Sequence, residues 1–319
     1  MAKLNLALYW AAACGGCDVA VLDVNEKILD IAAVANIVLW PVALDHKYAD
    51  VAKMAPGSID LCLFNGAIRN SENEQIARML REKSQVLVAF GSCAISGGIP
   101  ALANLKDRDD ILRRVYLETP STVNPDGVLP QTGCPTPVGD LHLPEFYDFV
   151  YSLDQVVEVD YYVPGCPPTP QRIWEVVQAV VSGNLPPRGA TVGALDKSLC
   201  DECQRVKRDK KIKRFYRSHE IITDPELCLL EQGLLCMGPV TRGGCGTQCI
   251  NANMPCRGCY GPLPGVTDQG AKYLSSIGAI MDARTPEEVD EIMQGIVDPA
   301  GTFYRFGMST SLLKGAVKQ

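Results

Sequence analysis

The chain has 319 residues, 47 % of them hydrophobic and 21 % charged, which is typical of a globular protein with a sizeable core. Its net charge of −7 argues against a nucleic-acid-binding protein, since such proteins are usually basic. No apolar stretch reaches membrane-spanning length, and the first residues, M-A-K-L-N-L, show neither a signal peptide nor a twin-arginine signal, so we expect a cytoplasmic protein. Structural disulfides are rare there, so the fourteen cysteines indicate metal or iron–sulfur ligation.

Residues 1 to about 185 alternate short apolar runs with amphipathic ones. The predicted strands are the apolar runs at 4–10, 37–42, 59–66, 85–92 and 156–165. Helical patterns lie between them, for example at 24–34 and 72–83. Because near-continuous apolar strands that alternate with helices are typical of a parallel sheet covered on both faces, we predict an α/β domain with a flavodoxin-like, doubly wound sheet. No G-x-G-x-x-G follows a strand, so a dinucleotide site is unsupported.

The stretch N-L-P-P-R at 184–188 marks a predicted domain boundary, with a flavodoxin-like domain at 1–187 and a second domain at 188–319. Residues 196–265 contain eight cysteines, many glycines and prolines, and few long apolar runs. Such a segment is expected to bury too little apolar surface to fold conventionally, and bound metal clusters would stabilise its fold instead. The tail from 270 onward has a helical amphipathic pattern. We therefore expect a second domain with little regular structure, followed by C-terminal helices.

Three predicted strands of the first domain are followed by cysteines: Cys14 and Cys17 after the first, Cys93 and Cys166 after two later ones. In an open parallel sheet those loops meet at the carboxyl edge, where ligands bind. Glycines flank each cysteine and permit close backbone approach. Four thiolates without a histidine suit a 4Fe–4S cluster or a structural zinc. The alternatives are small buried hydrophobic residues for Cys93 and Cys166, and a thioredoxin-like dithiol for Cys14 and Cys17.

Eight further cysteines lie within sixty residues of the second domain. They are Cys200, Cys203, Cys228, Cys236, Cys245, Cys249, Cys256 and Cys259. Two C-x-x-C pairs among them make a strong metal-site signal, with a pair of structural zinc ions as the alternative to iron–sulfur clusters. Of the two remaining cysteines, Cys62 lies in an apolar run and is assigned to the core, whereas Cys134 is interpreted as a spare thiol in a loop, with a ligand role as the alternative.

The order of these motifs resembles that of the small subunit of a NiFe hydrogenase. The matching pieces, which extend over nearly the whole chain, are A-C-G-G-C-D, G-S-C-A-I-S-G-G-I-P, P-G-C-P-P, C-L-L-E-Q-G-L-L-C-M-G-P-V-T and M-P-C-R-G-C-Y-G. Within the family the chain is most similar to the cytoplasmic methyl-viologen-reducing type that is associated with heterodisulfide reductase. The resemblance implies a proximal, a distal and a medial cluster. Their ligands would be Cys14, Cys17, Cys93 and Cys166 (the proximal set), Cys200, Cys203, Cys228 and Cys236 (the distal set), and a medial set that includes Cys245, Cys256 and Cys259.

Three departures from relatives bear on these clusters. Exported relatives begin the distal set with a histidine where this chain has Cys200, and a thiolate there should lower the potential of that cluster. They also leave the medial set one thiol short and hold a 3Fe–4S centre. Here Cys249 supplies a fourth medial thiol, so we predict three 4Fe–4S clusters in all. Oxygen-tolerant relatives carry two extra cysteines where this chain has Gly16 and Gly98, so ordinary oxygen sensitivity is expected.

The resemblance implies an electron-transfer subunit of an oxidoreductase that acts on H2. The nickel–iron site would belong to a large subunit, and this chain would pass electrons to a further iron–sulfur or flavin protein, with heterodisulfide reductase as one candidate. No nucleophile or general base is evident in this chain. His46, His142 and His219 are scattered and are interpreted as surface or capping residues. Asp18 is interpreted as a loop hydrogen-bonding residue, with a proton relay as the alternative.

Two other functions compete with the hydrogenase assignment. One is an iron–sulfur subunit of a respiratory-complex-like oxidoreductase, although those relatives have adjacent cysteines in the first motif. The other is a zinc-stabilised scaffold without redox activity. The basic run from Lys207 to Arg217, which lies between distal cysteines, is interpreted as a solvated loop, with docking of the next electron carrier as the alternative.

Overall fold

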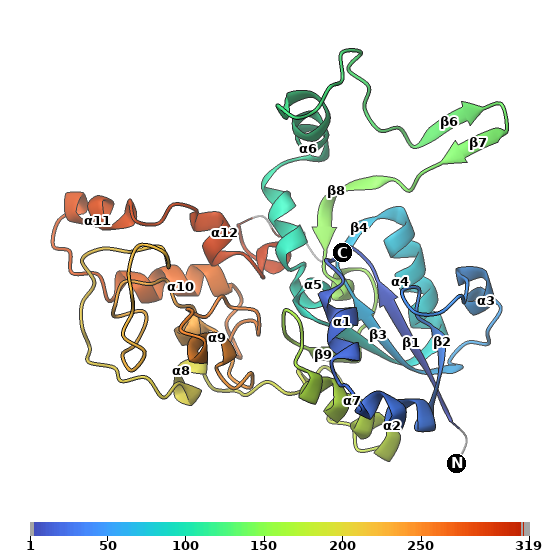
Figure 1. The fold of residues 1–319 in the computed structure, drawn as a ribbon, viewed down its shortest axis with the longest axis horizontal. Coiled ribbons are helices and arrows are strands. Elements are labelled where there is room, and N and C mark those ends of the chain that lie inside the picture. Colours follow the sequence, from blue (N-terminus) through green and yellow to red (C-terminus); the bar gives the residue numbers. More distant parts are fainter. Residues whose placement is uncertain (1–2, 314, 316–319) are drawn as a thin grey trace.

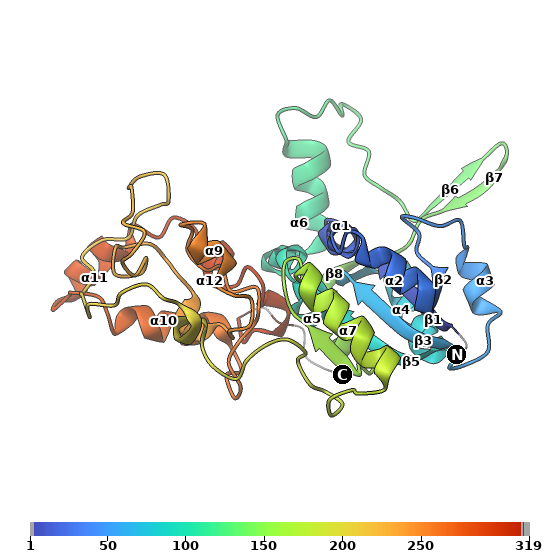
Figure 2. The ribbon, with the colours of Figure 1, turned by 60° about the horizontal axis from the view of Figure 1, so that its bottom comes forward.

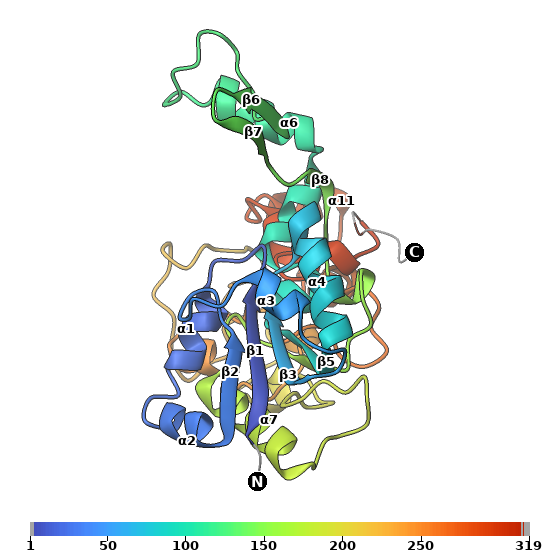
Figure 3. The same ribbon diagram turned by 90° about the vertical axis from the view of Figure 1, so that its right-hand side faces the viewer.

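The computed structural model describes residues 3–313 and 315. Its first part is built on a five-stranded sheet in the order β2-β1-β3-β5-β9, and all four strand pairs are parallel. The strands are β1 (Leu4–Trp10), β2 (Ala35–Leu39), β3 (Ile59–Asn65), β5 (Ser84–Phe90) and β9 (Tyr161–Val163). Counted along the chain, the sheet order is 2-1-3-4-5, which is the flavodoxin-like order. The predicted fold class is therefore confirmed (Figure 3).

Helices cover both faces of this sheet, as the near-continuous apolar strands require. One face packs against α1 (Gly16–Leu22), α2 (Lys27–Val34) and α7 (Pro170–Ser182) (Figure 2). The other face packs against α3 (Tyr48–Ala52), α4 (Ser71–Lys83) and α5 (Ser92–Ser96). Alternate residues of β1 serve the two cores: Leu6 and Leu8 on one side, Ala7 and Tyr9 on the other. Cys62 is fully buried in the second core, as predicted.

The last strand is much shorter than the predicted run at 156–165. A 3-10 turn, Leu153–Gln155, precedes the predicted run, and Ser152 and Gln155 cap this turn reciprocally. Asp160, directly before β9, points its carboxylate at Arg81 on α4 and at the Leu87 N–H group, with contacts of 2.6 and 2.7 Å. Within the predicted run, the N–H groups of Val156 and Val157 both donate to the Leu153 carbonyl oxygen at 3.0 Å and so close this turn, and only Tyr161–Val163 pairs with β5.

An arm between residues 106 and 149 leaves the body of the protein, and sequence periodicity did not indicate it. The 3-10 helix η1 (Ile99–Leu105) leads to α6 (Arg108–Arg113) and a π turn, η2 (Arg114–Glu118). The hairpin of β6 (Gly133–Thr136) and β7 (Gly139–His142) follows, and β8 (Phe146–Tyr151) returns to pair antiparallel with β4 (Ile68–Asn70). Figure 1 shows the arm projecting from the sheet. Cys134, expected in a loop, lies on β6 because it pairs with Leu141 across the hairpin.

The second part has little regular structure before its C-terminal helices, as predicted. Its elements are α8 (Leu199–Glu202), η4 (Gly238–Val240), α9 (Gln248–Asn251), α10 (Gln269–Gly278), α11 (Pro286–Met293), α12 (Pro299–Phe303) and η5 (Met308–Thr310). None of the helices that the structure describes is long and apolar enough to cross a membrane.

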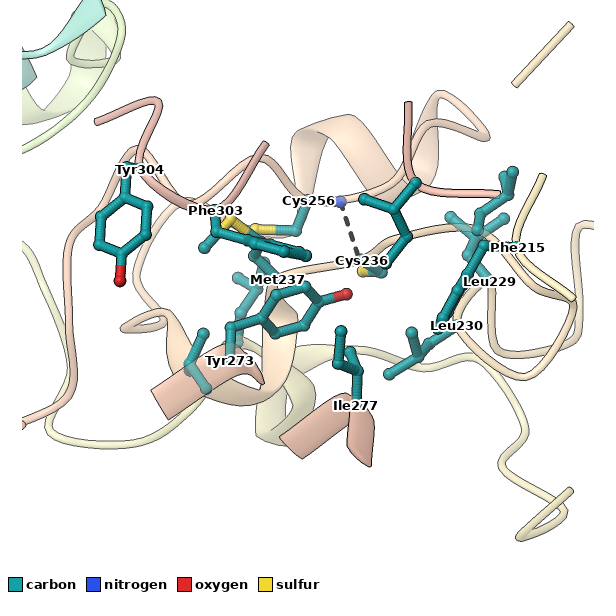
Figure 4. Close-up of a cluster of buried hydrophobic side chains, with 14 of the residues drawn as sticks. Phe215, Leu229, Leu230, Cys236, Met237, Cys256, Tyr273, Ile277, Phe303 and Tyr304 are labelled. Carbon is teal, nitrogen blue, oxygen red and sulfur yellow. Dashed lines mark hydrogen bonds between the residues drawn. The ribbon is translucent and has the colours of Figure 1, made fainter. Parts of the chain in front are cut away.

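The cysteine-rich segment nevertheless has an apolar core, contrary to the expectation that it buries too little surface. Phe215, Leu229 and Met237 from this segment pack with Tyr273 of α10 and Phe303 of α12 (Figure 4). The missing apolar surface thus comes from the tail helices. The same core includes Ala67, Ala101 and Val150 of the first part, so the two parts share buried surface. The boundary at 187/188 stays a prediction.

Candidate metal centres

The proximal set lies at the carboxyl edge of the sheet, with Cys14 and Cys166 in loops and Cys17 in the first turn of α1. Cys93 was expected in a loop but lies in α5, because that short helix begins directly after Gly91. Cys14 and Cys17 follow β1, Cys93 lies in α5 directly after β5, and Cys166 follows β9. Burial is the main cause that raises the pKa of Cys17 and of Cys166; the charges of Cys93, Cys166 and Cys14 add to it at Cys17, and that of Cys14 adds to it at Cys166. Burial and the charges of Cys166 and Cys14 raise the pKa of Cys93 to about 12. The structure thus brings together the four cysteines that strand topology predicted.

Glycine backbones allow these loops to close around the thiols. Gly91 has φ +86°, and a Cβ atom on it would lie 2.5 Å from the Cys17 Sγ atom. Gly98 has φ +54°, and a Cβ atom there would lie 2.6 Å from the Cys93 Sγ atom. Both conformations are ones that L side chains rarely adopt. The predicted close backbone approach is confirmed at these two positions.

The distal set surrounds a cavity of about 310 Å³, which all four cysteines line. Cys200 lies in the one-turn helix α8, and Cys203 is its C-terminal cap. Cys228 and Cys236 bracket a tight turn in which Leu234 N–H donates to the Leu229 carbonyl oxygen at 3.0 Å. Burial is the main cause that raises the pKa of Cys200 to about 12, and the charge of Cys236 adds to it.

The medial set is formed by two loops that follow one another in the sequence. Burial is the main cause that raises the pKa of Cys245, Cys256 and Cys259. The charge of Cys249 adds to it at Cys245, those of Cys166, Cys245 and Cys249 add to it at Cys259, and those of Cys236 and Cys259 add to it at Cys256. Backbone N–H groups oppose the effect of burial at two of these thiols: those of Thr247 and Gln248 lower the pKa of Cys245, and that of Gly258 lowers the pKa of Cys256. Cys249, the extra thiol, therefore lies near Cys245 and Cys259.

The three sets follow one another in space. Ser92, beside Cys93, donates its hydroxyl to the Cys259 carbonyl oxygen at 2.7 Å, and Cys259 also feels the charge of Cys166. At the other end of the medial set, the Cys256 N–H group donates to the Cys236 Sγ atom at 3.3 Å (Figure 4). The order in space is therefore proximal, medial, distal, although the distal cysteines precede the medial ones in the sequence.

Two residues that form contacts between the sets were not identified from the sequence. Ser92 holds the first part against the medial loop, and its only signal was its place in the G-S-C motif. Glu202, between the cysteines of the first distal pair, accepts the Gly244 N–H group at 2.9 Å and places its carboxylate near Cys245. Glu202 thus links the distal helix α8 to the medial loop, and the spacing of the cysteine motifs does not predict this contact.

The other candidate residues lie away from the cysteines or have structural partners. His46, His142 and His219 are exposed, as expected of surface residues. Asp18 is buried and accepts hydrogen bonds from the Trp40 indole at 2.9 Å and the Asn65 amide at 2.8 Å, which agrees with its hydrogen-bonding role, although it lies in the first turn of α1 rather than in a loop. Burial raises the pKa of Asp18. Within residues 3–313 and 315, no three His, Cys, Asp or Glu side chains lie close enough together to hold a single metal ion.

The chain was compared with known families and proteins. Residues 14–180 match the family model described as NADH ubiquinone oxidoreductase, 20 Kd subunit. The iron–sulfur subunit of the F420-non-reducing hydrogenase of Archaeoglobus profundus is 44 % identical, over 87 % of this chain and 88 % of its own length. The chain belongs to the family of NiFe hydrogenase small subunits. Its similarity to the corresponding subunits of F420-non-reducing hydrogenases identifies it as the methyl-viologen-reducing type.

Further relatives support this assignment of the small subunit. The corresponding F420-non-reducing hydrogenase subunit of Methanothermobacter marburgensis is 35 % identical, over 99 % of this chain and 98 % of its own length. A chain of an NAD+-reducing [NiFe]-hydrogenase in the H2-reduced state is 30 % identical, with a TM-score of 0.50, and covers 58 % of this chain and 94 % of its own length. The [NiFeSe] hydrogenase of Desulfovibrio vulgaris Hildenborough, at 17 % identity and a TM-score of 0.53 over 82 % of this chain and 95 % of its own, shows the fold alone.

Proposed function

We propose that this hydrogenase small subunit holds three 4Fe–4S clusters, receives electrons from H2 oxidation in a large subunit and passes them to a further redox protein. The observation that carries the proposal is the unbroken order of three four-cysteine sets, joined by the Ser92–Cys259 and Cys256–Cys236 contacts. The proximal set would face the large subunit. The distal set would be the exit, because it lies at the other end of the row.

The chemistry of the donor sets fits such clusters. In each set, burial and the charges of neighbouring thiols raise the pKa of several cysteines, among them Cys17, Cys200 and Cys259, so four thiolates together would be costly without a cation among them. A metal centre removes this cost because it binds thiols in their deprotonated form. The N–H groups that point at Cys236, Cys245 and Cys256 stabilise negative charge on sulfur. A 4Fe–4S cluster, when bound, supplies one-electron redox chemistry.

The cluster count can be tested at Cys249. Anaerobic iron and sulfide analysis of the complex should give about twelve irons in this chain, four for each cluster. Cys249→Ala should lower the count to about eleven and produce the paramagnetic signal of an oxidised 3Fe–4S centre. Cys134→Ala, which removes an exposed cysteine outside all three sets, should leave the count unchanged. About eleven irons in the unaltered protein would exclude Cys249 as a ligand, and colourless protein with zinc would support the scaffold alternative.

The environment of the complex is also open to test. We propose that the protein works in the cytoplasm and that heterodisulfide reductase is a candidate acceptor of its electrons. We also propose that the hydrogenase has ordinary oxygen sensitivity, because glycines occupy positions 16 and 98. Anaerobic affinity purification followed by subunit identification would test the acceptor, and cell fractionation the location. A proximal centre with six thiol ligands, or hydrogenase activity that survives prolonged exposure to air, would contradict the expected oxygen sensitivity.

A further inference from the structure

A basic loop lies directly beside the distal set. The loop, Lys207–Arg217, contains seven Lys or Arg residues and one Asp, so it carries +6 while the rest of the chain carries −13. Its residues Lys207, Lys210 and Lys211 line the same cavity as the four distal cysteines. The strongest positive charge of the sequence is therefore found where electrons are proposed to leave.

The fold holds this loop in place. Glu231 accepts the N–H groups of Arg208 and Asp209, at 2.8 and 2.9 Å, and so fixes the first half of the loop. Ile212 is 3 % exposed and exchanges backbone hydrogen bonds with the segment after α10, and Phe215 is 1 % exposed in the core. With these buried anchors, the loop is a built surface rather than a freely moving segment.

The basic side chains between the anchors face solvent. Arg208, Lys210, Lys213 and Arg214 are all exposed. Among the residues that the structure describes, only Asp282 forms an ion pair with the loop, at 3.5 Å from Lys213. Lys207 donates to the Cys200 carbonyl oxygen at 3.0 Å, so the loop touches the distal set itself. Most of the positive charge is thus left unneutralised at the surface.

We propose that the basic loop is the docking surface for an acidic face of the next electron carrier, a small low-potential iron–sulfur or flavin protein. This inference rests on the proposed function, since it requires electrons at the distal set. Complementary charge would steer the carrier and raise its association rate by about 10-fold to 1000-fold. Docking at this loop would also place the carrier beside the thiols of the distal set.

The test uses the anaerobic complex of large and small subunits and two electron acceptors. The first is a plant-type 2Fe–2S ferredoxin, an acidic one-electron carrier, of which each H2 reduces two molecules and releases two protons. The second is a zwitterionic sulfonated viologen, which has no net charge for the loop to attract. The variant is Arg208→Glu with Lys210→Glu. Its matched control is Lys53→Glu with Lys106→Glu, which makes the same change of charge at exposed sites of the first part.

At low salt we expect kcat/KM for ferredoxin to fall about tenfold or more in the loop variant and to change little in the control variant. The difference should vanish at high salt, because exposed charges are screened there. Equal rates for the loop variant and the unaltered complex, or an equal loss in both variants, would overturn the docking proposal. Failure of the unaltered complex to reduce the zwitterionic viologen with H2 would instead overturn the proposed electron-transfer function.

Discussion

Gly91 is the described glycine at which an added Cβ atom would come nearest to a proximal thiol, and Gly91→Ala is therefore an informative change. The residue lies between β5 and α5 with φ +86° and ψ 160°, a conformation almost restricted to glycine. A Cβ atom on it would lie 2.5 Å from the Cys17 Sγ atom. Its N–H group donates to the Val163 carbonyl oxygen at 2.8 Å, so the backbone cannot withdraw without loosening β9 from β5. The thiol of Cys17 must move instead.

The cost of this change has two parts. The strained backbone should cost about 1–3 kcal/mol, and the overlap with sulfur in a packed site about 1–3 kcal/mol more. The total of about 2–6 kcal/mol compares with a stability of about 5–15 kcal/mol for a whole domain. We therefore expect Gly91→Ala to fold with reduced stability and with Cys17 displaced from the proximal set.

Iron analysis, paramagnetic resonance and thermal unfolding of the anaerobic complex would measure the effect. Gly91→Ala should lose about four irons per chain together with the proximal signal, and should unfold at a lower temperature. Gly16→Ala is the control, because Gly16 begins α1 without a positive φ and its added Cβ atom would lie 3.4 Å from the Cys14 Sγ atom. Full iron content and an unchanged melting temperature in Gly91→Ala would refute the argument from close approach.

Two further predictions concern the scaffold. Asp160→Ala should lower the free energy of unfolding by about 3–5 kcal/mol in denaturant titration, because it removes the buried partner of Arg81. Arg188→Ala, whose exposed side chain lies 3.3 Å from the same carboxylate, should cost less than about 1 kcal/mol, and equal losses would contradict this. The Tyr147 hydroxyl donates to Glu74 at 2.7 Å and lowers the pKa of Glu74. The stabilisation from this bond is therefore fully present above the ordinary Glu pKa, and it is lost as the pH falls through the lowered pKa of Glu74. Tyr147→Phe should therefore cost about 1–2 kcal/mol at pH 7 and shift acid unfolding to higher pH, whereas a constant difference at every pH would refute the linkage.

The sheet and the proximal set could be predicted from the sequence because both follow from local pattern. Apolar strands buried on two faces indicate a parallel sheet, and parallel strands bring the residues that follow them to the carboxyl edge of that sheet. The arm at 106–149 could not be predicted in the same way. Its short hairpin makes few contacts with the body, so no buried face imposes a period on its residues. The last strand was overestimated because an apolar pattern does not reveal that Val156 and Val157 close the turn that begins at Ser152.

The sequence by itself predicted how the cysteines group: strand topology gave the proximal set, and the resemblance to hydrogenase small subunits gave the distal and medial sets. The tertiary structure supplied the contacts that link one set to the next. The Ser92–Cys259 contact joins residues 167 positions apart, and the Cys256–Cys236 contact joins two motifs that no spacing rule relates. The tertiary structure also placed the basic loop beside the distal set and supplied a core for the cysteine-rich segment from the tail helices. These features depend on which surfaces of distant segments pack together, and that choice follows from the burial of the whole chain rather than from any local pattern.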